Sequence, residues 1–153
     1  MKFGTKAIHE GVSPDSATGA IMTPIYQTST YVQEGVGNHK GFQYSRTSNP
    51  TRSALEANIA AIENGKHGAA FGSGLAAIDC VIKLLSPGDE VISTNDLYGG
   101  TFRIFKTIFE KYDIKFHFVP MGDTLAVVEK LNDNTKLIWV ETPTNPTMKI
   151  IDI

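Results

Sequence analysis

The chain has 153 residues, and its 14 basic and 16 acidic side chains give it a formal net charge of −2. This length can bury a core, and the charge gives no electrostatic reason to expect nucleic acid or an anionic membrane as a partner. A single cysteine, Cys80, excludes an intrachain disulfide and a cysteine-rich metal site. No secretory signal and no membrane-spanning apolar run is visible, so we expect a cytoplasmic location.

Residues 1–48 show neither a helical nor a strand period over any length. A structureless stretch this long is unusual inside a compact domain, and its apolar and aromatic residues are not typical of disorder. We therefore interpret residues 1–48 as an arm that buries its apolar side chains against a neighbouring subunit.

From Pro50 onward, helical and strand patterns alternate. Asn49 and Pro50 predict the start of a helix, and Asn64-Gly65 predicts its end. Apolar spacing predicts further helices at 75–85, 102–112 and 125–131, and strands at 68–72, 90–93, 114–119 and 136–141. This alternation predicts an α/β fold with right-handed crossovers, a mostly parallel sheet and helices on both of its faces.

Polar segments follow three of the predicted strands, at 72–74, 95–101 and 141–146. Ligands of parallel sheets bind at the carboxyl ends of the strands, so these segments are the candidate site. The glycines around Ser73 would let backbone N–H groups at a helix start hold a phosphate. The alternative is a tight strand-to-helix turn without a ligand.

Tyr44 and Arg46, which precede the first predicted helix, form a second candidate for phosphate binding. In an extended segment they would point the same way, and a guanidinium fork with a phenol hydroxyl suits phosphate oxygens.

Other polar residues have weaker patterns. Tyr98, followed by two glycines, could stack on a planar heterocycle or pack as a turn residue. Asn145 lies in a proline-rich loop, where its amide could bind a ligand. The alternative is that it only favours the turn. Cys80 is expected in the core. The four histidines are not spaced as metal ligands, so no metal site is predicted.

Four motifs occur in order: Tyr44-Ser-Arg-x-x-Asn-Pro-Thr51, Ser73-Gly-Leu-Ala-Ala77, Asp96-Leu-Tyr-Gly-Gly-Thr101 and Trp139-Val-Glu-Thr-Pro-Thr-Asn-Pro146. Over essentially its whole length the chain resembles the Cys/Met-metabolism family of pyridoxal-phosphate (PLP) enzymes. The resemblance implies an aminotransferase-like fold (fold type I), with residues 49–153 forming the first part of the PLP-binding large domain. It also implies amino-acid substrates and homo-oligomers, dimers that share active sites and assemble into tetramers.

The resemblance further implies roles for individual residues. Ser73, Gly74 and Leu75 would bind the cofactor phosphate, and Tyr44 and Arg46 would reach the phosphate held in a neighbouring subunit. Tyr98 would stack on the pyridine ring and take part in proton transfer. Asn145 would lie near the cofactor's phenolic oxygen, with Glu141 supporting its loop.

Cystathionine γ-synthase and cystathionine γ-lyase activities, in methionine and cysteine metabolism, are the functions that the resemblance favours. Methionine γ-lyase, cystathionine β-lyase and a non-catalytic phosphate-binding α/β domain remain as alternatives. In this family, the lysine that binds the cofactor covalently comes later than residue 153. We therefore expect the chain to be part of a longer polypeptide and to be inactive alone.

Overall fold

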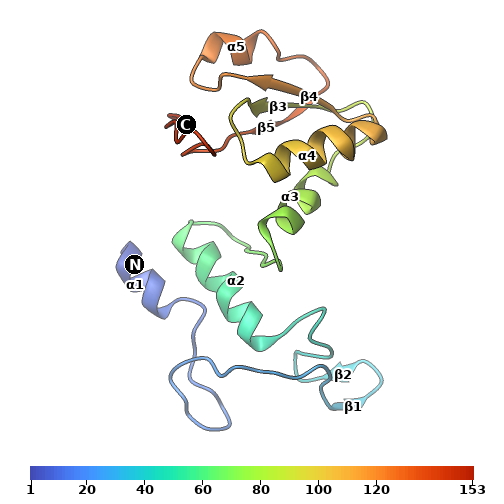
Figure 1. Cartoon of the computed structure of the whole chain (residues 1–153). Coiled ribbons are helices and arrows are strands. Elements are labelled where there is room, and N and C mark those ends of the chain that lie inside the picture. Colours follow the sequence, from blue (N-terminus) through green and yellow to red (C-terminus); the bar gives the residue numbers. More distant parts are fainter. The chain divides into compact units, whose positions relative to one another are not determined.

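The computed structural model of the chain describes residues 1–153, which form two compact units, Met1–Ala70 and Phe71–Ile153. The first unit holds α1 (Phe3–His9), a short antiparallel pair β1 (Gln33–Gly35) and β2 (Asn38–His39), and α2 (Pro50–Ile62). The second contains α3 (Gly74–Ile82), β3 (Glu90–Thr94), α4 (Gly99–Thr107), the 3₁₀ helix η1 (Phe109–Tyr112), β4 (Lys115–Val119), α5 (Thr124–Val128) and β5 (Thr135–Trp139) (Figure 1). None of these helices combines the length and the apolar character needed to cross a lipid bilayer.

Helix α1 is a correction to the sequence analysis, which found no helical period in residues 1–48. The helix has seven residues and buries none of them, so it has no apolar stripe that a pattern search could detect. Polar contacts hold it against α2 instead. The Asn58 amide donates to the carbonyl oxygens of Lys6, Ala7 and Glu10 at 2.8–3.3 Å. The Lys6 ammonium donates to the Ala61 carbonyl oxygen at 3.1 Å.

Helix α2 confirms the predicted start and end. Asn49 has an extended backbone, and its side-chain oxygen accepts a hydrogen bond from the Thr51 N–H group at 2.9 Å, as an N-cap does. Pro50 occupies the first helical position, where its missing N–H group costs nothing. After Ile62 the chain turns at Asn64, whose φ of 55° is left-handed.

The second unit is built on a parallel sheet, as predicted, and its strand order is β4-β3-β5. From β3 the chain moves to one side through α4, and from β4 it crosses back past β3 through α5. Right-handed crossovers in opposite directions place their helices on opposite faces. Accordingly, α4 and α5 lie on either side of the sheet (Figure 1).

Two predicted elements differ in the structure. Residues 68–72 form no strand, because a strand requires a ladder partner and the sheet consists of β4, β3 and β5 alone. The helix expected at 102–112 ends at Thr107: Ile108, with a φ of −113° and a ψ of −63°, is its C-cap, and η1 follows. Left-handed Asp113 then directs the chain into β4.

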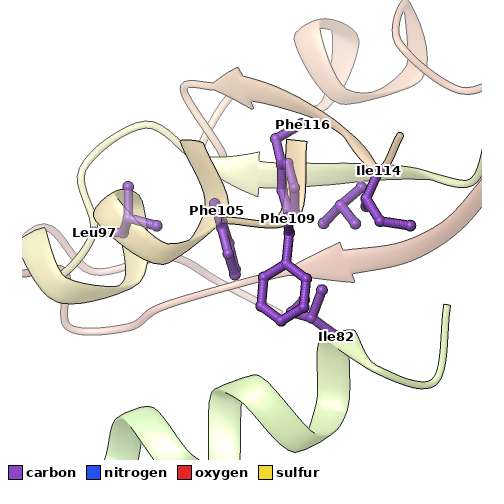
Figure 2. Packing of buried hydrophobic residues seen from close by; sticks show 7 residues of the cluster. Ile82, Leu97, Phe105, Phe109, Ile114 and Phe116 are labelled. Atoms are coloured by element: carbon purple, nitrogen blue, oxygen red, sulfur yellow. The ribbon is translucent and has the colours of Figure 1, made fainter. Parts of the chain in front are cut away.

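The core lies between the sheet and the α3–α4 side (Figure 2). Phe105 is fully buried; its ring stacks on Phe116 with a centroid distance of 4.4 Å and meets Trp139 edge-on at 5.8 Å. Cys80, expected in this core, is exposed. It lies two residues from both Ile78 and Ile82, so at about 100° per residue it points away from the face that they bury.

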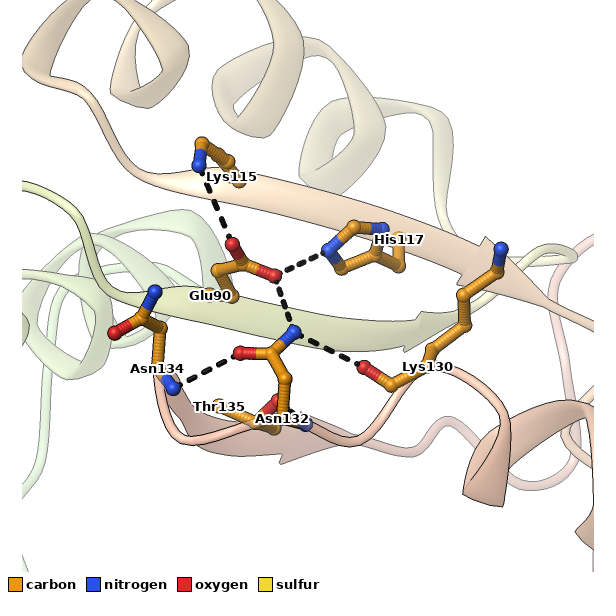
Figure 3. A network of polar contacts seen from close by, with 7 residues as sticks. All are labelled: Glu90, Lys115, His117, Lys130, Asn132, Asn134 and Thr135. Atoms are coloured by element: carbon orange, nitrogen blue, oxygen red, sulfur yellow. Dashed lines mark hydrogen bonds and ion pairs between the residues drawn. The ribbon is translucent and has the colours of Figure 1, made fainter.

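A polar network occupies the amino ends of β3 and β4 (Figure 3). The Glu90 carboxylate accepts hydrogen bonds from the Asn132 amide at 2.8 Å and from Lys115 at 3.3 Å, and His117 Nε2 lies 2.7 Å from it. The hydrogen bonds from Asn132 and His117, with the Lys115 charge nearby, lower the Glu90 pKa to about 2. A largely buried carboxylate is thereby kept charged at the end of the sheet opposite the candidate site.

Candidate functional site

Tyr98 lies in the loop that follows β3, at the first turn of α4. Its backbone N–H donates to both carboxylate oxygens of Glu141, at 3.0 and 3.2 Å. Its ring lies over Gly100: a Cβ atom at position 100 would be 2.4 Å from Tyr98 Cε1 and 3.0 Å from Cζ. The side chain is nevertheless 48% exposed, so part of the ring remains open to a ligand.

A second set of hydrogen bonds joins the loop that follows β5 to the loop that follows β3. Asp96 accepts hydrogen bonds from the hydroxyl groups of Thr144 and Thr147, and Thr144 is buried. These hydroxyls, with the Lys149 charge a smaller contribution, hold the pKa of the Asp96 carboxyl below its usual value. The aspartate is therefore a charged acceptor that fixes both threonines.

These contacts form a reciprocal arrangement that we call the loop clasp, made by Asp96, Tyr98, Glu141, Thr144 and Thr147. A carboxylate of each loop accepts hydrogen bonds from the other loop. Asn145 lies within the clasp sequence, between the two threonines, and its side chain is exposed. The structure thus brings Tyr98 and Glu141 into contact and holds Asn145 on a loop fixed to theirs.

Helix α3 begins with the predicted glycine-rich turn. The Ser73 hydroxyl accepts from the Ala76 N–H group at 3.2 Å and caps the helix. The N–H groups of Gly74 and Leu75 have no partner within the chain, and no atom lies within 4 Å of a Cβ built at Gly72 or Gly74. A helix start with free N–H groups and open space is suited to an anion. The Ser73 hydroxyl accepts in the cap and keeps its own O–H group as a donor, so it can bind an anion together with the two backbone N–H groups.

Tyr44 and Arg46 lie together, but not as predicted. The segment is not extended: the Tyr44 carbonyl oxygen accepts hydrogen bonds from the N–H groups of Thr47 and Ser48, both at 3.0 Å, which makes a turn. The turn brings Arg46 Cζ to 5.0 Å from the centre of the Tyr44 ring, a cation–π contact. Both side chains are exposed, so they form one basic and phenolic surface. A turn brings them together, and not the extended backbone that we expected.

Sequence reasoning assigned no role to three members of the loop clasp, Asp96, Thr144 and Thr147. Their contacts join residues 48 and 51 positions apart, so local spacing could not reveal them. The detectable signal was topological, because β3 and β5 are neighbours and the loops after their carboxyl ends must lie close together.

Comparisons with known proteins agree with the four motifs. The family described as "Cys/Met metabolism PLP-dependent enzyme" matches residues 4–153. The chain is 50% identical over 151 residues to a "Probable cystathionine gamma-synthase" of Herpetosiphon aurantiacus, with 99% of this chain and 47% of that protein covered. It is 47% identical over 153 residues to a "Cystathionine gamma-lyase" of Bacillus subtilis, with 100% and 40% covered.

Among solved structures, the cystathionine gamma-lyase of Lactobacillus plantarum, complexed with L-serine, matches with a TM-score of 0.92 and 47% identity. The match covers 99% of this chain and 39% of that chain. The chain therefore spans less than half the length of the proteins that it matches.

Proposed function

The chain belongs to the Cys/Met-metabolism family of PLP-dependent enzymes, and we propose that it forms part of a cystathionine γ-synthase or a cystathionine γ-lyase. The first activity joins an activated homoserine ester to cysteine, and the second splits cystathionine. We place the synthase first because synthase relatives are 50–51% identical to the chain, against 47% for the γ-lyase and 47–48% for β-lyase relatives. The longer protein's activity, substrates and partners are all part of this proposal.

The residues of the chain fit the cofactor of the family. PLP carries a phosphate dianion and an aromatic ring, and the chain offers the free N–H groups of Gly74 and Leu75 together with a partly exposed Tyr98 ring. When bound, PLP stabilises negative charge that develops on the carbon atoms of an amino acid. The single observation that carries the proposal is the loop clasp, because it fixes the Tyr98 backbone and the loop that carries Asn145 at the carboxyl edge of a parallel sheet.

In the proposed site, Gly74, Leu75 and the capped turn at Ser73 would hold the phosphate. Tyr98 would pack against the ring of the cofactor and could exchange a proton through its hydroxyl group, while Asn145 would lie near the phenolic oxygen. Glu141 holds the Tyr98 backbone, because both of its carboxylate oxygens accept a hydrogen bond from the Tyr98 N–H group. Tyr98 and Asn145 are exposed, and Gly74 and Leu75 have N–H groups without a partner in the chain, which supports the availability of these four residues to a ligand.

Tyr44 and Arg46 are proposed to bind the phosphate of a neighbouring copy, so that the enzyme is a homo-oligomer with shared sites. Eight large apolar side chains of residues 1–48 are highly exposed, namely Met1, Phe3, Ile8, Ile21, Met22, Ile25, Val32 and Val36. Apolar groups in this number are suited to burial against another subunit. Analytical ultracentrifugation of the longer enzyme should detect a dimer or tetramer, and a purely monomeric active enzyme would contradict this part of the proposal.

The activity is tested by two parallel assays of the enzyme that contains this chain. One supplies O-succinylhomoserine or O-acetylhomoserine with cysteine and measures cystathionine; the other supplies cystathionine alone and measures 2-oxobutyrate. The proposal expects one of these products, with the synthase reaction faster. Absence of both products from a PLP-loaded enzyme would refute it.

A further inference from the structure

Arg52, in the first turn of α2, makes an unusual set of contacts with the turn that carries Arg46. Its guanidinium donates to three successive carbonyl oxygens of that turn: Ser45 at 3.4 Å, Arg46 at 3.4 Å and Thr47 at 2.5 Å. Arginine presents its donors in a rigid planar fork, so one side chain can fix a whole turn.

Glu56 sets the direction of this fork. Arg52 Nε is buried and has no hydrogen-bond partner, yet it lies 3.3 Å from Glu56 Oε1 as an ion pair one helical turn along. The same oxygen accepts a hydrogen bond from the Ala70 N–H group at 3.0 Å. The carboxylate is thus anchored from two sides and orients the guanidinium toward the turn.

Arg52 provides the hydrogen bond to the Arg46 carbonyl oxygen, in the middle of the turn. The ends of the turn have other support: the Thr47 and Ser48 N–H groups and the Thr47 hydroxyl donate to the Tyr44 carbonyl oxygen, and Ser45 donates to residues 28 and 29. The Arg46 guanidinium lies over the exposed Tyr44 ring. Because the guanidinium of Arg52 is paired with Glu56, it acts by fixing the turn and not by adding charge. A fixed turn presents Tyr44 and Arg46 to a ligand at a lower entropic cost.

We propose that Arg52 is a positioning residue for phosphate binding: it fixes the Tyr44–Thr47 turn so that Tyr44 and Arg46 face the phosphate of the cofactor. This inference rests on the proposed function of Tyr44 and Arg46. Arg52 itself does not touch the ligand. It acts through the three carbonyl oxygens that it binds.

The test compares PLP with pyridoxal, which has the same ring and aldehyde but no phosphate. Arg52→Lys keeps the charge but cannot bind three carbonyl oxygens and Glu56 together. Calorimetric titration of the apoenzyme of the longer protein should show PLP binding weakened about tenfold, as is typical when supporting residues of a site are changed. Pyridoxal binding should be unchanged.

The controls separate the possible causes. Arg103→Lys, the same change at an exposed arginine of α4, should alter neither affinity. If Arg52→Lys does not fold, Glu56→Gln decides, because it removes the anion that orients the fork and should weaken PLP in the same selective way by a smaller factor. Equal loss of PLP and pyridoxal affinity, or no loss of either, would overturn the inference.

Arg46→Gln shows which of the two claims fails. If it leaves the ratio of PLP to pyridoxal affinity unchanged, the proposed phosphate role of Arg46 is wrong. If it lowers that ratio while the Arg52 and Glu56 variants do not, the phosphate role stands and the positioning role of Arg52 is wrong.

Discussion

Gly100→Ala should lower the activity of this protein without lowering its stability. A methyl group at position 100 would lie 2.4 Å from Tyr98 Cε1, whereas carbon atoms in contact are separated by about 3.5–4.0 Å. The tyrosine ring therefore has to move by about 1 Å or more. Misplacing a group that positions a substrate by about 1 Å can lower the rate about 10²-fold.

The stability should change in the opposite direction. Gly100 lies in the first turn of α4, and its φ is not in the left-handed region, so alanine is compatible with the backbone. Replacing glycine by alanine in a helix stabilises it by about 0.5–1 kcal/mol. We expect an unchanged or raised melting temperature together with a kcat/KM that is lower by about two orders of magnitude.

Gly99→Ala is the matched control, because no atom lies within 4 Å of a Cβ built there. The assays are kcat/KM of the PLP-loaded enzyme and thermal unfolding of the same two variants. If Gly100→Ala keeps the kcat/KM of Gly99→Ala, the Tyr98 ring position does not matter for the reaction and the reasoning is refuted.

Three further substitutions test other parts of the structure. Phe105→Ala, at a fully buried and doubly stacked ring, should lower the free energy of unfolding by about 3–5 kcal/mol in urea titrations; a loss below about 1 kcal/mol would contradict the described core. Asn49→Ala removes the α2 cap and the bond to the Tyr26 carbonyl oxygen and should cost about 1–2 kcal/mol, whereas Asn49→Asp should keep the cap. Because the folded-state pKa of Glu90 is lowered to about 2, its stabilising effect is present above the usual carboxyl pKa and is lost as the pH falls from about 4.5 toward 2. Melting temperatures over that range should fall less for Glu90→Gln than for the unaltered protein, and parallel curves would count against the network.

The sheet could be predicted from sequence because its signals are local. Each of its three strands is a short apolar run, and each is separated from the next by a helical pattern, so alternation alone indicated parallel pairing. The start of α2 was equally local, since Asn49 and Pro50 act on their own neighbours.

The features that could not be predicted depend on partners far away in the chain. Residues 68–72 have a strand-like composition, but composition does not specify a ladder partner. The sequence analysis expected Tyr44 and Arg46 to lie together because it assumed an extended backbone. In the structure they are joined by a turn that Arg52 stabilises. A side chain that binds backbone carbonyl oxygens leaves no trace in spacing, since every residue carries a carbonyl group.

The loop clasp has a consequence for how this protein can change. Asp96 needs the hydroxyl groups of Thr144 and Thr147, whereas Glu141 binds a backbone N–H group that any residue except proline supplies at position 98. The two halves of the clasp therefore differ in what they tolerate. Replacing both threonines by residues without a hydroxyl group leaves the Asp96 carboxylate without these donors, while the Glu141 contact survives a change of the Tyr98 side chain.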